Sequence, residues 1–162
     1  MAAGTWRVFG VAKRRMGTAG LQLSSGTFKM ALHTTTASAN LSIGRSVGPA
    51  GAPGITIWSS IGNEIGVSSG RYAVGGVACG GVKWSVAANT STMKFYYTTT
   101  GVIITASAGS MTNVRYAVIR TSTGATDGVP ICYASLSTAQ FTVTSPNTLT
   151  ILPAGTGVFT LG

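Results

Sequence analysis

About two in five residues of this chain are glycine, serine or threonine, and only 8% are charged. A soluble domain usually carries roughly 25% charged residues, so this surface must consist largely of hydroxyl groups and backbone. The 44% apolar residues suffice for a core, which excludes a disordered polyelectrolyte. Long helical bundles need Ala, Glu, Lys, Leu and Arg to dominate, which they do not here. The composition therefore predicts an all-β fold with a surface typical of an assembly component.

The length of 162 residues suits one domain that buries its own core. We expect a β-sandwich domain, jelly-roll-like or a partly closed barrel, over residues 21–162. Residues 1–20 are expected to form a basic arm or a short helix. No exact internal repeat appears, so neither a solenoid nor a propeller is expected.

The clearest strand pattern lies at residues 27–33, where Phe28, Met30 and Leu32 occupy alternate positions. Seven further short strands are expected at the spacing of a sandwich or barrel. They are residues 92–98, 102–107, 113–122, 130–137, 140–144, 148–152 and 157–161.

Glycine shapes the remaining segments. Pairs at 75–76 and 80–81 predict a strand that is bent or bulged twice within residues 70–87. Glycines and prolines over residues 42–54 predict a long exposed loop. The spacing of apolar residues over 55–65 is compatible with a short helix.

The chain is short of catalytic and metal-binding residues. The single histidine, His33, lies at the end of the predicted strand, and we interpret it as a strand-edge or surface residue. The two carboxylates, Glu64 and Asp127, lie far apart in the sequence, and Asp127 falls in an ordinary turn sequence. Too few candidate ligands are present for a zinc or calcium site, and no Gly-Lys-Thr or Gly-Lys-Ser sequence follows the glycine pairs, as a phosphate-binding loop would require. We therefore expect no enzyme, catalytic residue, cofactor or metal.

Cys79 and Cys132 could form at most one disulfide, which a chain of this size does not require. We interpret them as free thiols in a reducing compartment, with a disulfide as the alternative. The longest apolar runs, such as residues 102–104, are far shorter than the ~20 residues of a membrane helix.

The net charge of +9 is densest near the N-terminus. There, cations and aromatic residues form a segment that we call the N-terminal cluster: Trp6, Arg7, Phe9, Lys13, Arg14 and Arg15. Its spacing is compatible with an amphipathic helix. Such a cluster can dock on an acidic protein surface, or bind nucleic acid through phosphates and stacking. The other cations are spread along the chain, unlike those of a dedicated nucleic-acid reader, so we expect protein docking, with nucleic acid or simple solubility as alternatives.

Several short motifs resemble a known family. They are Phe28-Lys29-Met30-Ala31-Leu32, Ser59-Ser60-Ile61-Gly62-Asn63-Glu64-Ile65, Gly70-Arg71-Tyr72-Ala73-Val74-Gly75-Gly76, Val114-Arg115-Tyr116-Ala117-Val118-Ile119, Pro130-Ile131-Cys132-Tyr133, Gln140-Phe141-Thr142-Val143 and Val158-Phe159-Thr160-Leu161. In this order they resemble a family of small structural proteins of tailed bacteriophages, of the capsid-associated or decoration type. The resemblance covers most of residues 6–161. It implies a β-sandwich virion component without catalytic activity.

We therefore expect a minor capsid or decoration (cement) protein that binds the major capsid protein or other virion proteins as a homo-oligomer. Assembly in the host cytoplasm would place it in the virion, with no membrane partner. The alternative is a receptor- or glycan-binding module of a tail or fibre. That alternative requires exposed aromatic side chains such as Trp58, Tyr96 and Tyr97 on one loop end.

Overall fold

A computed structural model describes most of the chain. The described residues are 4–18, 20–24, 26–37, 41, 57–66, 72, 74–81, 83–86, 93–96, 101–122, 128–152 and 157–161. The expected long loop at residues 42–54 and the carboxylate Asp127 lie outside them. Within the described residues the fold is all-β, with antiparallel strands and the short helix α1 (Gly10–Gly17).

The largest sheet has five strands, and each neighbouring pair is antiparallel. Their order across the sheet is β1 (Arg7–Val8), β9 (Pro130–Ser135), β8 (Tyr116–Thr121), β2 (Phe28–His33) and β3 (Val77–Ala78). The three central strands are buried almost along their whole length. Both faces of this sheet are therefore covered.

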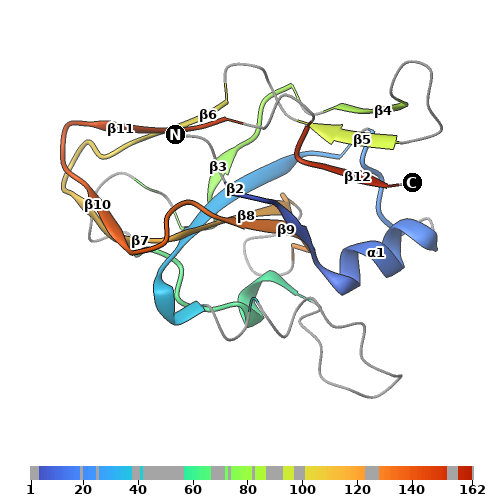
Figure 1. Cartoon of the computed structure of the whole chain (residues 1–162), viewed down its shortest axis with the longest axis horizontal. Helices are drawn as coiled ribbons and strands as arrows, with labels where there is room; N and C mark the ends of the chain where they lie inside the picture. Colours follow the sequence, from blue (N-terminus) through green and yellow to red (C-terminus); the bar gives the residue numbers. More distant parts are fainter. Residues whose placement is uncertain are drawn as a thin grey trace.

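Three smaller sheets complete the described strands. One pairs β7 (Met111–Val114) with β10 (Phe141–Val143), and another pairs β6 (Val102–Thr105) with β11 (Thr148–Ile151). The third contains β12 (Phe159–Leu161), β5 (Met93–Tyr96) and β4 (Lys83–Val86), in that order. Figure 1 places β6, β7, β10 and β11 at one end of the molecule and α1 (Gly10–Gly17) toward the other.

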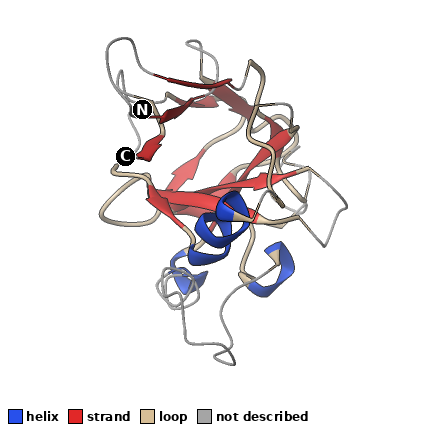
Figure 2. Ribbon diagram, turned by 90° about the vertical axis from the view of Figure 1, so that its right-hand side faces the viewer, coloured by secondary structure: helices blue, strands red, loops and turns tan. Residues whose placement is uncertain are grey.

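The helical turns gather on one side of the strands. Figure 2 shows α1 and the two short 3₁₀ turns, η1 (Thr35–Ala37) and η2 (Trp58–Ser60), below the strand layers in that view. Helix α1 packs on β9 and buries Gly10, Val11 and Ala12. No described helix is both long and apolar enough to cross a membrane.

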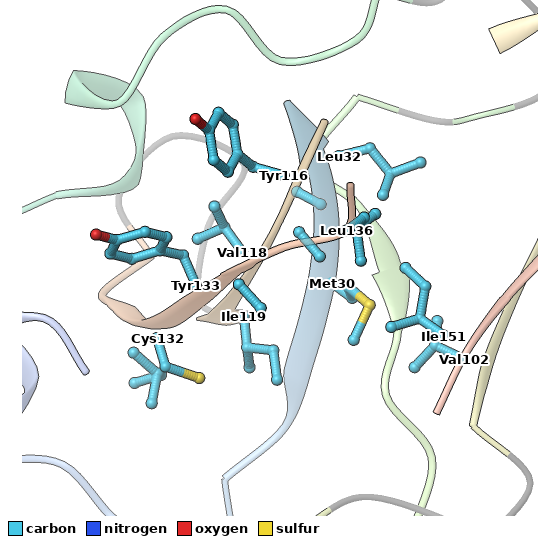
Figure 3. Packing of buried hydrophobic residues seen from close by; sticks show 14 of the residues in the cluster. Met30, Leu32, Val102, Tyr116, Val118, Ile119, Cys132, Tyr133, Leu136 and Ile151 are labelled. Atoms are coloured by element: carbon cyan, nitrogen blue, oxygen red, sulfur yellow. The ribbon is translucent and has the colours of Figure 1, made fainter. Parts of the chain in front are cut away.

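One hydrophobic core joins the sheets. Figure 3 shows side chains from β2, β8 and β9 beside Val102 and Ile151 of the β6–β11 pair. Met30, Ile119 and Ile151 are all fully buried in this cluster. The apolar alternation of residues 27–33 correctly predicts β2, but Ala31 and His33 on its other face are buried as well.

Three expectations for local structure need correction. The segment expected as one strand at 113–122 contains the end of β7 and all of β8, and the two strands are separated at Arg115, which belongs to neither. The pair 80–81 lies in the turn between β3 and β4, and the pair 75–76 comes directly before β3, so neither pair forms a bulge within one strand. The helix compatible with residues 55–65 is only the single turn η2. Whether the sheets form a sandwich or a partly closed barrel stays a prediction.

Candidate functional site

The fold buries the aromatic residues of the N-terminal cluster and leaves most of its cations exposed. Phe9 is fully buried against Tyr133, with ring centroids 5.3 Å apart, and Trp6 is also buried in the core. The expectation that these two aromatic residues belong to a docking surface is therefore wrong. They precede helix α1, because Phe9 has extended backbone angles and its amide donates to the Ile131 carbonyl at 2.9 Å.

The cations of the N-terminal cluster stay at the surface. Arg7, Lys13 and Arg14 are exposed, and Arg15 is half-buried. Arg14 and Arg15 lie in the last turn of α1, where positive charge interacts favourably with the helix dipole. Because β1 pairs with β9 and the aromatic residues anchor the segment, these cations project from a fixed platform instead of a free arm. We call Arg7, Lys13 and Arg14 the basic platform.

A second polar group lies inside the protein, around Arg120 of β8. The Arg120 side chain has no exposed surface. Its Nε and Nη2 donate to the Gly75 carbonyl at 3.0 and 2.6 Å, and its Nη1 donates to the Thr121 carbonyl at 3.0 Å. The guanidinium carbon also lies 5.1 Å from the centre of the Trp58 ring, within the range of a cation–π contact. Arg120 is thus enclosed by backbone and aromatic surface.

Glu64 is the carboxylate that accompanies this buried cation. Its Oε1 accepts hydrogen bonds from the Tyr72 hydroxyl and the Gly75 amide, each at 2.7 Å. Burial raises the pKa of Glu64, whereas these two hydrogen bonds and the Arg120 charge lower it. The Tyr72 hydroxyl in turn accepts from the Leu32 amide at 2.8 Å. The carboxylate therefore ties the segment around Gly75 to strand β2.

His33 also contacts Trp58. It is 1% exposed, which corrects the expectation of a strand-edge or surface histidine. Its Nδ1 donates to the Gly62 carbonyl at 2.8 Å, and its ring meets that of Trp58 edge-on at 4.8 Å. Burial lowers the pKa of His33 to about 4, although the bond to Gly62 acts in the opposite direction. His33 is therefore neutral near pH 7, with its proton on Nδ1.

This arrangement of His33, Glu64 and Arg120 suits a structural role. A general base must reach the proton that it abstracts, and the His33 Nε2 is enclosed and has no described hydrogen-bond partner. The Glu64 oxygen that approaches the network already accepts two hydrogen bonds. Within the described residues, no three His, Cys, Asp or Glu side chains are grouped so that they could hold a metal ion.

The cysteines and the aromatic residues can also be placed. Cys79 and Cys132 are both buried and free, as the preferred interpretation holds. Burial raises the pKa of Cys79 to about 12. Trp58 is buried at 5% exposure, so it cannot contribute to an exposed glycan-binding surface. Tyr97 and the side chain of Tyr96 lie outside the described residues.

The sequence analysis counted Arg120 only as one of the scattered cations. One signal could have singled it out. It ends the apolar run 116–119, in which a solvated arginine would be unusual, and such a position predicts a cation with internal partners.

No protein-family model, curated protein or solved structure matches the chain.

Proposed function

We propose that the chain is a non-enzymatic structural protein of a bacteriophage virion, and specifically a minor capsid or decoration (cement) protein of the head shell. It would act by binding a neighbouring virion protein, the major capsid protein first of all. Three observations support the proposal: the motifs resemble those of that family, Glu64 and Arg120 form hydrogen bonds inside the protein, and the basic platform is exposed.

Residues of the two most specific motifs form part of the buried hydrogen-bond network and of the central sheet. Tyr72 and Gly75, from the Gly-x-Tyr-x-x-Gly-Gly motif, hold Glu64 and Arg120. The Arg-Tyr-Ala-Val-Ile motif includes most of β8, the middle strand of the five-stranded sheet. These residues stabilise the fold. A stable, fixed surface is what a structural protein contributes to an assembly.

The basic platform is the observation that carries the proposal. Its cations are exposed, whereas Glu64, the carboxylate within the described residues, is engaged in the internal network. An exposed group of like charges favours a partner of opposite charge. Because the platform is fixed by Trp6 and Phe9, it can present its charges without a large ordering cost. An acidic patch on the outer shell is the partner that this surface fits.

The test measures occupancy on virus particles. The variant carries Arg7→Gln, Lys13→Gln and Arg14→Gln, which remove the charges and leave the buried aromatic residues in place. We expect the variant to fold like the unmodified chain, by circular dichroism and by its unfolding midpoint, but to be depleted from purified particles. Normal occupancy of this variant would contradict docking through the platform.

A control variant removes the same number of charges elsewhere in the sequence, at Arg45, Lys83 and Lys94, each changed to Gln. We expect this control to keep its occupancy. Equal loss in both variants would show that net charge, and not the platform, determines binding. A particle reconstruction without density for the unmodified protein would overturn the virion assignment itself.

A further inference from the structure

The four strands at one end of the molecule contain no Asp, Glu, Lys, Arg or His. Strands β6, β7, β10 and β11 gather there, away from α1 (Figure 1). Residues 101–114 and 128–162, which include all four strands, contain no Asp, Glu, Lys, Arg or His. We call the four strands β6, β7, β10 and β11 the neutral end. In a chain of net charge +9, the charge is therefore confined to other parts of the sequence.

The β6–β11 pair provides the most apolar surface of the neutral end. Its register sets Ile103 opposite Thr150, and alternate residues of β6 face outward. Ile103 is 56% exposed, and Leu152, directly after β11, is 39% exposed. Thr105 and Thr148, which pair across the strands, are exposed as well. The outer face of the pair is thus a stripe of two large apolar side chains and threonine hydroxyls, which we call the β6–β11 stripe.

We propose that the β6–β11 stripe is the contact through which a second copy of this chain binds. The choice of occupant follows from charge. Two copies of net charge +9 repel each other wherever their cations approach, and a contact through the neutral end adds no charge of its own strands to that repulsion. An acidic partner gains nothing from a neutral surface and is drawn to the cationic parts. The neutral end therefore suits a second copy of the chain, and the cationic parts of the surface suit an acidic partner.

The stripe also suits a twofold contact. In such a contact the same patch lies on both subunits and must be complementary to itself. A neutral stripe of Ile, Leu and Thr satisfies this condition, because apolar groups can pack on their own copies and hydroxyl groups both donate and accept hydrogen bonds. Burial of Ile103 and Leu152 against the second copy would supply the hydrophobic contribution. This inference stands apart from the virion proposal, because self-association can be measured on the isolated chain.

The experiment is sedimentation equilibrium of the full chain over a range of concentrations. We expect the unmodified protein to self-associate. Ile103→Arg places like charges on both sides of the contact and should raise the dissociation constant at least tenfold. The matched control is Val74→Arg, since Val74 is 57% exposed but lies before β3, outside the stripe. We expect that control to associate like the unmodified chain.

A second variant, Thr105→Arg, keeps the test valid if Ile103→Arg does not fold. Thr105 is exposed on the same face, so its substitution should also weaken association. A chain that stays monomeric at its highest soluble concentration would overturn the proposal. Equal weakening by Val74→Arg would overturn it too, because it would assign the effect to net charge instead of the stripe.

Discussion

The Gly75 carbonyl accepts two hydrogen bonds from the Arg120 guanidinium, at 3.0 Å from Nε and 2.6 Å from Nη2. The same glycine donates its amide to Glu64 Oε1 at 2.7 Å. Gly75 thus links a buried cation to its carboxylate through its own backbone. The Coulomb attraction between Arg120 and Glu64 is thereby supported by hydrogen bonds that satisfy both groups.

Arg120→Lys should destabilise the protein strongly although it keeps the charge. A lysine cannot donate two hydrogen bonds in the planar arrangement that the Gly75 carbonyl receives, nor stack in the same way on Trp58. We expect the free energy of unfolding to fall by about 2–4 kcal/mol. Urea unfolding measures this change. The exposed Arg14→Lys is the control and should alter stability by less than about 0.5 kcal/mol. Equal effects at the two positions would contradict the buried network.

Gly75→Ala tests how closely the cation approaches the backbone. Gly75 has a φ of +95°, and a Cβ placed on it would lie 2.7 Å from Arg120 Nη2. Gly62 also has a positive φ, +65°, but its Cβ would meet nothing within 4 Å. We expect Gly62→Ala to cost about 1 kcal/mol from backbone strain alone. Gly75→Ala should cost about 2–4 kcal/mol, because steric overlap is added to the strain.

A double substitution separates the two contributions at Gly75. In an Arg120→Met background the guanidinium is absent, so Gly75→Ala should lose part of its additional cost over Gly62→Ala. Thermodynamic coupling between positions 75 and 120 would appear as non-additive unfolding free energies. Additive free energies would show that the two residues act independently.

Stability should decrease with acid because of His33. The unfolded chain binds a proton at this side chain near the usual pKa of 6.5, whereas the folded protein stays neutral down to about 4. Between these values the unfolded state binds more protons, so the free energy of unfolding falls as the pH is lowered from about 6.5 to about 4. The contribution amounts to ~3 kcal/mol, fully present above pH ~6.5. Unfolding midpoints measured across this range test it.

His33→Asn is the matched variant for the pH dependence. Its amide nitrogen can still donate to the Gly62 carbonyl, but the side chain no longer titrates. We expect the stability curve of this variant to be flatter than that of the unmodified chain between pH 6.5 and 4. Glu64 acts in the opposite direction, since its raised pKa favours the folded state as the pH falls through that value. Parallel curves for the two proteins would contradict the assignment to His33.

Phe9 should be necessary for folding. Its ring is fully buried against Tyr133, so Phe9→Ala should lower the free energy of unfolding by about 3–5 kcal/mol. Lys13→Ala, on an exposed position of α1, should change it little. Removal of residues 1–16 should therefore unfold the body, because it deletes β1 and both buried aromatic residues. A truncated chain with the unmodified unfolding midpoint would show that the segment is a separable arm.

The two thiols should be unreactive in the folded protein. Burial raises the pKa of Cys79 to about 12 and raises that of Cys132 well above its usual range. The thiolate is the reactive form, and both sulfurs are enclosed. We expect a soluble disulfide reagent such as DTNB to label neither cysteine at pH 7 and both in urea. Rapid labelling under native conditions would contradict the burial of these groups.

The strands were the part of the fold that the sequence predicted well. Residues 28–33 alternate because successive side chains of a strand point to opposite faces of the sheet. The period-two patterns likewise predicted β6 (Val102–Thr105) and β11 (Thr148–Ile151), which pair with each other. Burial of both faces could not be predicted, since His33 and Ala31 give no sign of being covered. The burial of the second face depends on segments that are distant in the sequence and pack against the strand.

The polar groups were harder to predict, for two physical reasons. Trp6, Phe9 and Lys13 have helical spacing by coincidence, although Trp6 and Phe9 lie before the helix begins. The apolar run before Arg120 indicates an internal cation, but its partner Gly75 lies far away in the sequence and could not be predicted. Hydrogen bonds between such segments depend on the fold and leave no local pattern.

The separation of the basic platform from the neutral end gives the protein two kinds of surface with opposite responses to salt. Salt screens charge–charge attraction and leaves apolar contacts intact or strengthens them. Ionic strength alone could then release the protein from an acidic neighbour while pairs of copies stay together. Such a component would leave a particle as an assembled unit, not as single chains.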